Sequence, residues 1–285
     1  MPGAPDPLYV AARRTLLDAL EAMEEHLDAV VLVGAQAVYV HTGEGELEVA
    51  PYTTDGDLAL DPWRLGSDPV IDSLLEGAGF VQSPDHVGRW AKSAPVEADE
   101  RDMIVDLLVP DSLGGPGRRA ARIPPHSRRA ARKVQGLEGA LVDRDVYPIG
   151  ALHAADPRWF KVAVAGPSAL LVAKIHKIED RAPDPDRRTD KDALDVFRLL
   201  QAVSTLELVQ RLTVLLDDSR SRAVTSEALE RFSEVFGRPN AVGCTMAARA
   251  AAPLEDPDMI SAAAAALSGD LIVELETRGV MPSGT

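Results

Sequence analysis

The residues of this chain best suited to chemistry are two aspartates separated by a single glycine. Asp55 and Asp57 lie in the segment TTDGDLAL at positions 53–60. Residues two apart in a β-strand share a face, so both carboxylates would point one way while Leu58 and Leu60 point the other. Neighbouring carboxylates repel each other and resist desolvation; magnesium, which binds one or two carboxylates together with substrate phosphates, relieves both costs. The pair predicts a metal-assisted nucleotidyl-transfer site, although Asp-x-Asp also occurs at solvated strand ends.

A glycine turn and a third aspartate could complete such a site. Gly34 follows the apolar run at 29–33, and backbone N–H groups at a strand–Gly–helix turn can meet a phosphate. Asp106 interrupts the apolar run at 103–109. A buried carboxylate without a partner is costly, so Asp106 either has a partner or lies at an exposed sheet end. Three aspartates on neighbouring strands is the arrangement that two-metal phosphoryl transfer uses, which makes Asp106 a third candidate metal ligand.

The hydrophobic pattern predicts the elements that would position these residues. We expect helices at 7–28, 35–41 and 69–77, and strands at 29–33, within 53–60, near Phe80, at 89–91, at 103–109, and near Val146 and Val162. The Gly-, Pro- and Arg-rich region 110–125 is expected to be a connection. Successive helices should follow from Pro167 to about Thr277, with turns at 183–185, 237–239 and Pro253. The predicted fold class is α+β: a mixed α/β sheet flanked by helices in a domain at 1–165, then a helical domain at 166–285.

One lysine and one aspartate have unusual places on the predicted C-terminal helices. In the helix at 169–180, about 100° per residue puts Lys174 inside the arc of large apolar residues. Such a lysine either extends its ammonium past the core to water or holds a triphosphate in a cleft. Asp192, at the margin of the next apolar face, could orient Lys174 or the substrate, whereas Asp195 is expected on the surface, paired with Lys191. Lys174→Met would then change the melting temperature little.

Composition limits the classes of protein to which the chain can belong. Its 285 residues are 46% hydrophobic but only 4% aromatic, so Ala, Leu and Val must fill the core. Cys244 is the only cysteine, which excludes an internal disulfide and a cysteine-based zinc site. Neither a signal peptide nor an apolar run of about 20 residues is present, so we expect a cytoplasmic protein with no membrane association.

The net charge of the chain is −15, which argues against a protein that coats DNA in general. One basic stretch is an exception to this acidic composition. Between Gly117 and Leu137 there is no acidic residue but there are seven basic ones: Arg118, Arg119, Arg122, Arg128, Arg129, Arg132 and Lys133. A local basic patch can bind nucleic acid on an acidic protein. The stretch is therefore either an RNA-binding surface or a solvated loop and helix.

Taken in order, these motifs resemble the minimal nucleotidyltransferases of the AbiEii and MenT toxins, which belong to the DNA-polymerase-β-like superfamily. That family has a Gly-Gly or Gly-Ser turn, an Arg-x-Thr-x-Asp-x-Asp segment, a helix lysine and a late Lys/Arg-Asp. The resemblance extends over most of the chain, through matching segments at 31–38, 53–58, 105–108, 170–174, Arg181 and 191–195.

The resemblance implies a magnesium- or manganese-dependent enzyme. Asp55 and Asp57 would be catalytic metal ligands, and Lys174 and Asp192 would complete the catalytic set. The nucleotide would be bound by Gly34, Ala35, Thr54 and Lys174. Toxins of this family transfer nucleotides from NTPs, in some members to the 3′ end of tRNA, and usually act beside a cognate antitoxin. Thr53 occupies a position that is a site of inhibitory phosphorylation in some members.

Two departures from the family pattern leave alternatives open. Ala35 stands where a second Gly or Ser is usual, and Pro51 stands where Arg is usual. Both are compatible with a non-catalytic nucleotide- or RNA-binding module that has kept the fold and lost transfer activity. A transferase that modifies a small hydroxyl compound, of the aminoglycoside type, is a further possibility, against which the basic stretch weighs.

Overall fold

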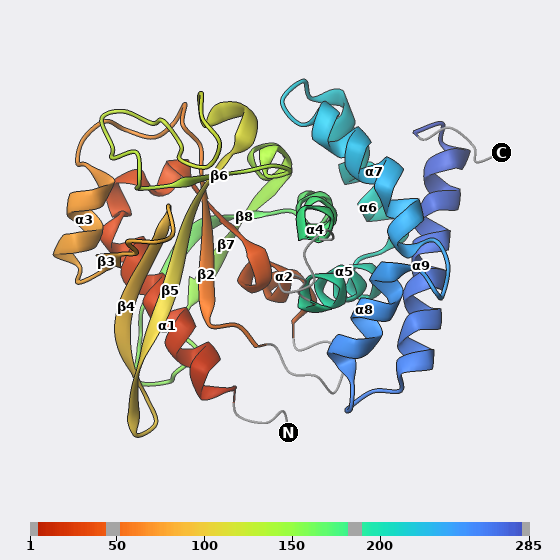
Figure 1. Cartoon of the computed structure of the whole chain (residues 1–285), viewed down its shortest axis with the longest axis horizontal. Helices are drawn as coiled ribbons and strands as arrows, with labels where there is room; N and C mark the ends of the chain where they lie inside the picture. Colours follow the sequence, from red (N-terminus) through yellow and green to blue (C-terminus); the bar gives the residue numbers. More distant parts are fainter. Residues whose placement is uncertain (1–4, 44–51, 182–189, 281–285) are drawn as a thin grey trace.

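The computed structural model describes residues 5–43, 52–181 and 190–280, and the structural statements below refer to these residues (Figure 1). Pro51 and the turn predicted at 183–185 lie outside them. The chain forms a mixed α/β half followed by a helical half, as the sequence predicts. The first half ends with β8 (Trp159–Ala165), and the second begins with α4 (Pro167–Arg181). The change in structure therefore falls at the predicted boundary, while the division into two folding domains stays a prediction.

The described residues of the first half form one sheet of eight strands. In chain order its elements are α1 (Pro7–Ala22), η1 (Glu24–Ala29), β1 (Val30–Val33), α2 (Gly34–Thr42), β2 (Asp55–Leu60), α3 (Ile71–Gly77), β3 (Val81–Gln82), β4 (Arg89–Val96), β5 (Asp99–Pro110), η2 (Asp111–Leu113), β6 (Arg132–Val134), η3 (Glu138–Leu141), β7 (Arg144–Gly150) and β8. The strand order is β3-β4-β5-β2-β1-β8-β7, with β6 also paired to β5.

Strands β4 and β5 are longer than the strands expected at 89–91 and 103–109, and two further details of this half differ from the prediction. The helix expected at 7–28 ends at Ala22, and a 3-10 helix continues to Ala29. The sequence pattern also did not predict β6, a strand of three residues inside the basic stretch. Such a short segment has too few residues to show an alternating pattern, so only its pairing with Leu108–Pro110 of β5 defines it.

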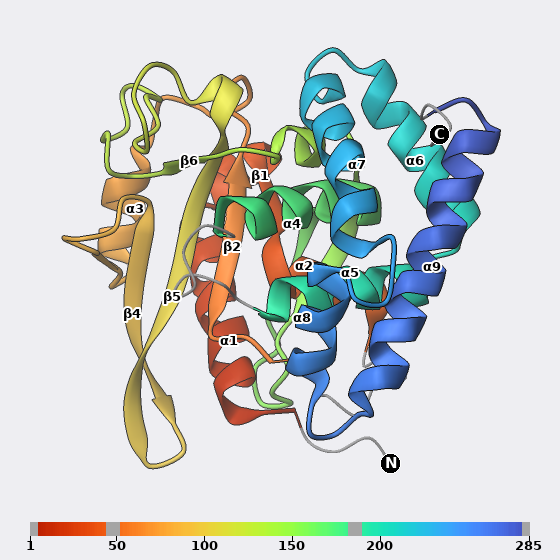
Figure 2. The ribbon, with the colours of Figure 1, turned by 45° about the vertical axis from the view of Figure 1, so that its right-hand side comes forward.

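In the described part of the second half there are six helices: α4, α5 (Asp190–Ala202), α6 (Thr205–Asp217), α7 (Arg222–Phe236), α8 (Val242–Ala251) and α9 (Pro257–Thr277). Helices α4 and α5 lie between the sheet and the outer helices (Figure 2). Within the described ranges no single helix is long and apolar enough to span a membrane; α5 and α6 pass that test only as a pair bent by 114°.

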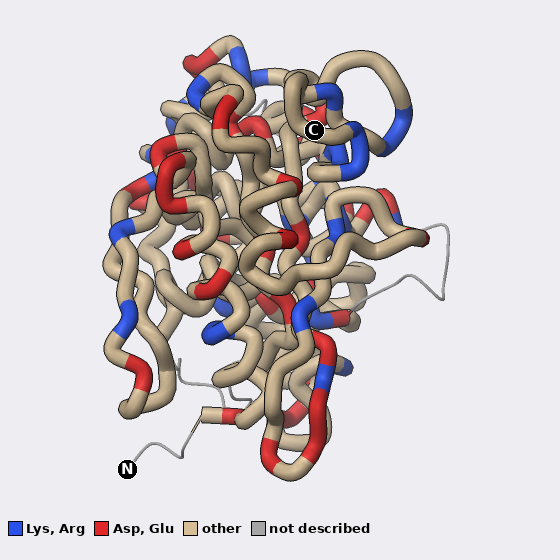
Figure 3. Tube along the Cα trace, turned by 90° about the vertical axis from the view of Figure 1, so that its left-hand side faces the viewer, with Lys and Arg blue, Asp and Glu red and all other residues tan. Residues whose placement is uncertain are grey.

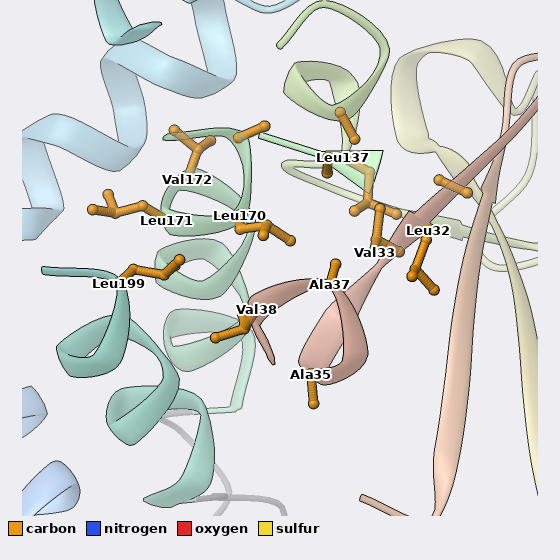
Figure 4. Packing of buried hydrophobic residues seen from close by; sticks show 14 of the residues in the cluster. Leu32, Val33, Ala35, Ala37, Val38, Leu137, Leu170, Leu171, Val172 and Leu199 are labelled. Atoms are coloured by element: carbon orange, nitrogen blue, oxygen red, sulfur yellow. The ribbon is translucent and has the colours of Figure 1, made fainter. Parts of the chain in front are cut away.

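The two halves share a hydrophobic core. Helix α2 packs on β1 and β2 on one side and on α4 and α5 on the other. In Figure 4, Val38 of α2 points toward Leu170 of α4 and Leu199 of α5. On the opposite side of α2, Val33 belongs to β1 of the sheet. These side chains are fully or almost fully buried. Because α2 begins at Gly34, this packing fixes the candidate site between the sheet and α4.

Candidate functional site

The register of the sheet places the predicted carboxylates in one row. Asp57 of β2 is opposite Val33 of β1 and opposite Asp106 of β5, and Asp106 is in turn opposite Arg89 of β4. Directly opposed residues share a face of a sheet. Asp55, two residues before Asp57, shares that face. The sequence prediction that Asp55, Asp57 and Asp106 come together on neighbouring strands is confirmed.

Gly34 lies directly against Asp57. A β-carbon at Gly34 would be 2.0 Å from Oδ2 of Asp57, and the backbone of Gly34 has a φ of +70°. Both facts require glycine, because a positive φ is strained for other residues and any side chain at this position would displace the carboxylate of Asp57. Val33, at the N-cap position of α2, offers no side-chain hydrogen bond to the first N–H groups of the helix. The helix thus begins beside Asp57 with uncapped donors.

The electrostatics at Asp57 favour a bound cation. Burial, together with the charges of Asp55 and Asp106, raises the pKa of Asp57 to about 6, although Lys177 and Arg132 act in the opposite direction. A carboxylate that resists ionisation in this way is stabilised by a divalent cation. Asp55 and Asp57 therefore fit magnesium bound by two carboxylates and substrate phosphates. No group of three His, Cys, Asp or Glu side chains among residues 5–43, 52–181 and 190–280 is arranged to hold a metal by itself.

Asp55 is held by a chain of hydrogen bonds that sequence analysis missed. The hydroxyl of Thr53 donates to Oδ1 of Asp55. Nε2 of Gln36 donates to the backbone carbonyl oxygen of Asp55 at 3.0 Å, and Nε of Arg13 donates to Oε1 of Gln36 at 2.7 Å. Thr53 is only 1% exposed, so phosphorylation at this predicted position requires local opening of the segment. The sequence offered little signal for these bonds, because the burial of Gln36 and Arg13, which makes them need partners, is set by the fold.

Asp106 is paired with two arginines, Arg89 and Arg132, whereas a metal ligand needs a carboxylate oxygen for the cation. Its Oδ1 accepts from Nε of Arg89 at 3.1 Å, and its Oδ2 accepts from Arg89 at 3.4 Å and from Arg132 at 3.2 Å. The aspartate itself is 2% exposed. Both carboxylate oxygens are thus engaged by arginines. Its predicted role as a third metal ligand stays a prediction, and the pairing argues against it.

Lys174 lies at the wall of the cleft with its ammonium between two aspartates. Its Nζ donates to Oδ1 of Asp192 at 2.8 Å and to Oδ2 of Asp195 at 2.6 Å. Asp192 also pairs with Lys177 at 3.1 Å and with Arg181 at 3.1 Å. Although burial opposes the charge of Lys174, Asp192 and Asp195 raise its pKa above the ordinary value. The expected contact between Lys174 and Asp192 is confirmed.

The expectation for Asp195 was wrong. It is fully buried and bonds to Lys174 rather than lying on the surface with Lys191. Its second oxygen, Oδ1, is buried without a hydrogen-bond partner among the described residues. A helical wheel assumes one apolar face, but α5 packs against α2, α4, α8 and α9. A helix surrounded in this way buries part of its polar face as well.

These groups line one cleft of about 660 Å³. Gly34, Asp57, Asp106 and Lys174 are part of its wall, and so are His86, Arg89, Lys177 and Arg181. Other predicted site residues are beside the wall rather than in it: Ala35 and Asp192 are buried, Asp55 is partly buried, and Thr54 is exposed. The cleft contains eight Lys or Arg residues and five Asp residues, so its lining is basic in a chain of net charge −15.

Only some of the seven residues of the basic stretch line the cleft. Arg118, Arg119, Arg132 and Lys133 line the cleft, whereas Arg122 and Arg128 are exposed outside its lining. Arg129 donates to the carbonyl oxygens of Ser83 and Pro84, both at 2.7 Å. In the side view of Figure 3 the Lys and Arg positions are dispersed along the trace. RNA binding by the stretch stays a prediction, and the cleft-lining members are its natural candidates.

Comparison of the chain with protein-family models, with curated proteins and with solved structures finds no significant match. The functional assignment therefore depends on the geometry of the cleft and on the motif resemblance.

Proposed function

We propose that this protein is a magnesium- or manganese-dependent nucleotidyltransferase that transfers nucleotides from an NTP to an RNA acceptor such as the 3′ end of tRNA. The observation that carries the proposal is the contact of Gly34 with Asp57, at the point where α2 begins and where Asp55 and Asp57 share a strand face. Uncapped helix N–H groups bind phosphate, and adjacent carboxylates bind the metal that accompanies it.

In this reaction the acceptor hydroxyl oxygen bonds to the α-phosphorus of the NTP. The bond from that phosphorus to the bridging oxygen of the β-phosphate breaks, pyrophosphate leaves, and the hydroxyl proton passes to water. A divalent cation, when bound, would stabilise the negative charge that develops on the reacting phosphate. Asp55 and Asp57 would hold the cation, the Gly34 turn would bind donor phosphates, and Lys177 and Arg181 across the cleft would attract the triphosphate.

Lys174 has a positioning role in this proposal. Its ammonium is already bonded to Asp192 and Asp195, so its own contact with the nucleotide, as the resemblance implies, would require it to leave one aspartate. By holding Asp192, Lys174 also fixes the carboxylate that orients Lys177 and Arg181. Action as a toxin beside a cognate antitoxin follows from the motif resemblance alone.

The test is transfer of label from each of the four α-³²P-NTPs to total tRNA in the presence of magnesium or manganese. We expect one or two NTPs to label the tRNA, and periodate-oxidised tRNA, which lacks the 3′ diol, to remain unlabelled. Asp57→Asn should abolish labelling. Absence of transfer from all four NTPs, with NTP binding retained, would instead support the non-catalytic module. The ion pairs of both carboxylate oxygens of Asp106 with arginines favour that alternative.

A further inference from the structure

Asp106, Arg89 and Arg132 form a cluster in the lining of the cleft, which we call the arginine clamp. Asp106 is buried, but the side chains of Arg89 and Arg132 are 37% and 36% exposed, and both line the cleft. A guanidinium has five N–H donors. The contacts with Asp106 use two nitrogens of Arg89 and one of Arg132. Both arginines therefore keep donors for a ligand in the cleft.

The fold brings the two arginines together at one junction in the sheet. Along the same edge of β5, pairing with β4 ends at Arg89 opposite Asp106, and pairing with β6 begins at Arg132 opposite Leu108. Gly88 makes this close approach possible. Its φ is +76°, and a β-carbon there would lie 2.5 Å from the backbone nitrogen of Arg132. The clamp is thus built by the backbone and not by two flexible side chains that meet by chance.

We propose that Arg89 and Arg132, positioned by Asp106, bind a phosphate of the acceptor strand and that Asp106 does not ligate the metal. This inference rests on the proposed function. In-line displacement puts the attacking and leaving oxygens on opposite sides of the reacting phosphorus. Gly34, which would bind donor phosphates, lies on the β1 side of Asp57, and the clamp lies on the β5 and β4 side. The clamp is therefore on the acceptor side.

The cleft beyond the clamp fits an acceptor with more than one phosphate. Arg118, Arg119 and Lys133 also line it. Lys133 is tied to Asp111 at 3.1 Å, whereas Arg118 and Arg119 are exposed. Such a basic lining suits a single-stranded RNA, and it would repel a cationic hydroxyl compound such as an aminoglycoside.

The test measures binding of a short single-stranded RNA with a 5′-hydroxyl end, without NTP, to wild-type protein and to Arg89→Met and Arg132→Met. We expect each variant to bind the RNA about ten-fold or more weakly, the usual effect of removing a charged hydrogen bond. The slope of log affinity against log salt should fall by about 0.7 for each RNA phosphate that the variant no longer neutralises. An NTP analogue should bind the variants within about two-fold of wild type.

Arg128→Met is the matched control, since it removes one arginine of the same stretch outside the cleft lining. It should leave RNA affinity within about two-fold of wild type. If Arg89→Met destabilises the protein, Arg89→Lys keeps the charge but loses the forked geometry, and it should also weaken RNA binding. Unchanged RNA affinity in Arg89→Lys and Arg132→Met, or a loss confined to NTP binding, would overturn the proposal.

Asp106→Asn separates positioning from metal ligation. We expect the Mn²⁺ affinity of this variant to stay within about two-fold of wild type. Its RNA affinity should fall, because Arg89 and Arg132 lose the carboxylate that positions them, although loss of a negative charge by itself would strengthen phosphate binding. A ten-fold or greater loss of Mn²⁺ affinity, or tighter RNA binding, would contradict the positioning role. If no transfer is ever detected but RNA binding depends on the clamp, the proposed function is wrong and the clamp remains an RNA-binding site. If transfer occurs and the KM for RNA is unchanged in Arg89→Met, the proposed role of the clamp is wrong and the proposed function is not affected.

Discussion

The ammonium of Lys174 lies 2.6 Å from Oδ2 of Asp195, and both side chains are buried. This contact joins α5 to α4 at Lys174, which lines the cleft. A buried ion pair of this kind is weak evidence of net stabilisation, but removing one partner leaves an uncompensated charge in the interior. The contact therefore connects the stability of the helical half to the geometry of the cleft.

Lys174→Met should strongly destabilise the protein, contrary to the expectation from sequence. The substitution leaves Asp192 and Asp195 buried, which lowers the free energy of unfolding by about 3–5 kcal/mol. Urea denaturation monitored by circular dichroism measures this loss. Lys177→Met is the control, because Lys177 contacts the same oxygen of Asp192 at 3.1 Å but is 38% exposed; its loss should cost under about 1 kcal/mol. Equal effects of the two substitutions would contradict the buried network.

Gly34→Ala should abolish nucleotide transfer and destabilise the protein. Alanine strains at a φ of +70°, and its β-carbon would occupy the space of the Asp57 carboxylate. The comparison is Gly79→Ala, since Gly79 also has a positive φ but would meet only Lys92, at 3.9 Å. That control should lose about 1–2 kcal/mol from backbone strain alone and keep full activity. Comparable activity in the two variants would show that the Gly34 contact does not matter for function.

Asp57→Asn should stabilise the metal-free protein at neutral pH. Folding raises the pKa of Asp57 from 3.8 to about 6. At a pH between these two values, Asp57 keeps its proton in the folded protein but has lost it in the unfolded chain. Stability therefore falls as pH rises from about 4 to about 6, and the loss persists above that, by roughly 2–3 kcal/mol at pH 7. Melting in EDTA at pH 4, 5, 6 and 7 should show the variant and wild type diverging across this window. Parallel curves would mean that Asp57 ionises normally.

Metal binding should reverse that difference. Asp55 and Asp57 repel each other in the metal-free protein, and a cation that binds only the folded state stabilises it. Manganese at about one hundred times its Kd should raise the free energy of unfolding of wild-type protein by about 2.7 kcal/mol. Asp57→Asn should show little rise, whereas Asp106→Asn should respond as wild type does. A wild-type melting temperature that does not change with manganese would exclude a metal site at the pair.

Local sequence patterns were sufficient to predict the framework of the cleft. Alternation over two residues placed Asp55 and Asp57 on one face of β2, and the apolar runs located β1 and β5. Proline at 167 and the helical period marked the start of the C-terminal helices. These features depend on neighbours within a few residues, and the physical causes of strand and helix formation act over the same range.

The partners of the charged groups were decided only by tertiary structure. Arg89 and Arg132 reach Asp106 across 17 and 26 residues because β4 and β6 share one edge of β5. Asp195 meets Lys174 because α5 is enclosed by other helices, so its polar face is buried too. Which cation satisfies which carboxylate depends on strand register and helix packing, and these are set by the whole core and not by the residues near the charge.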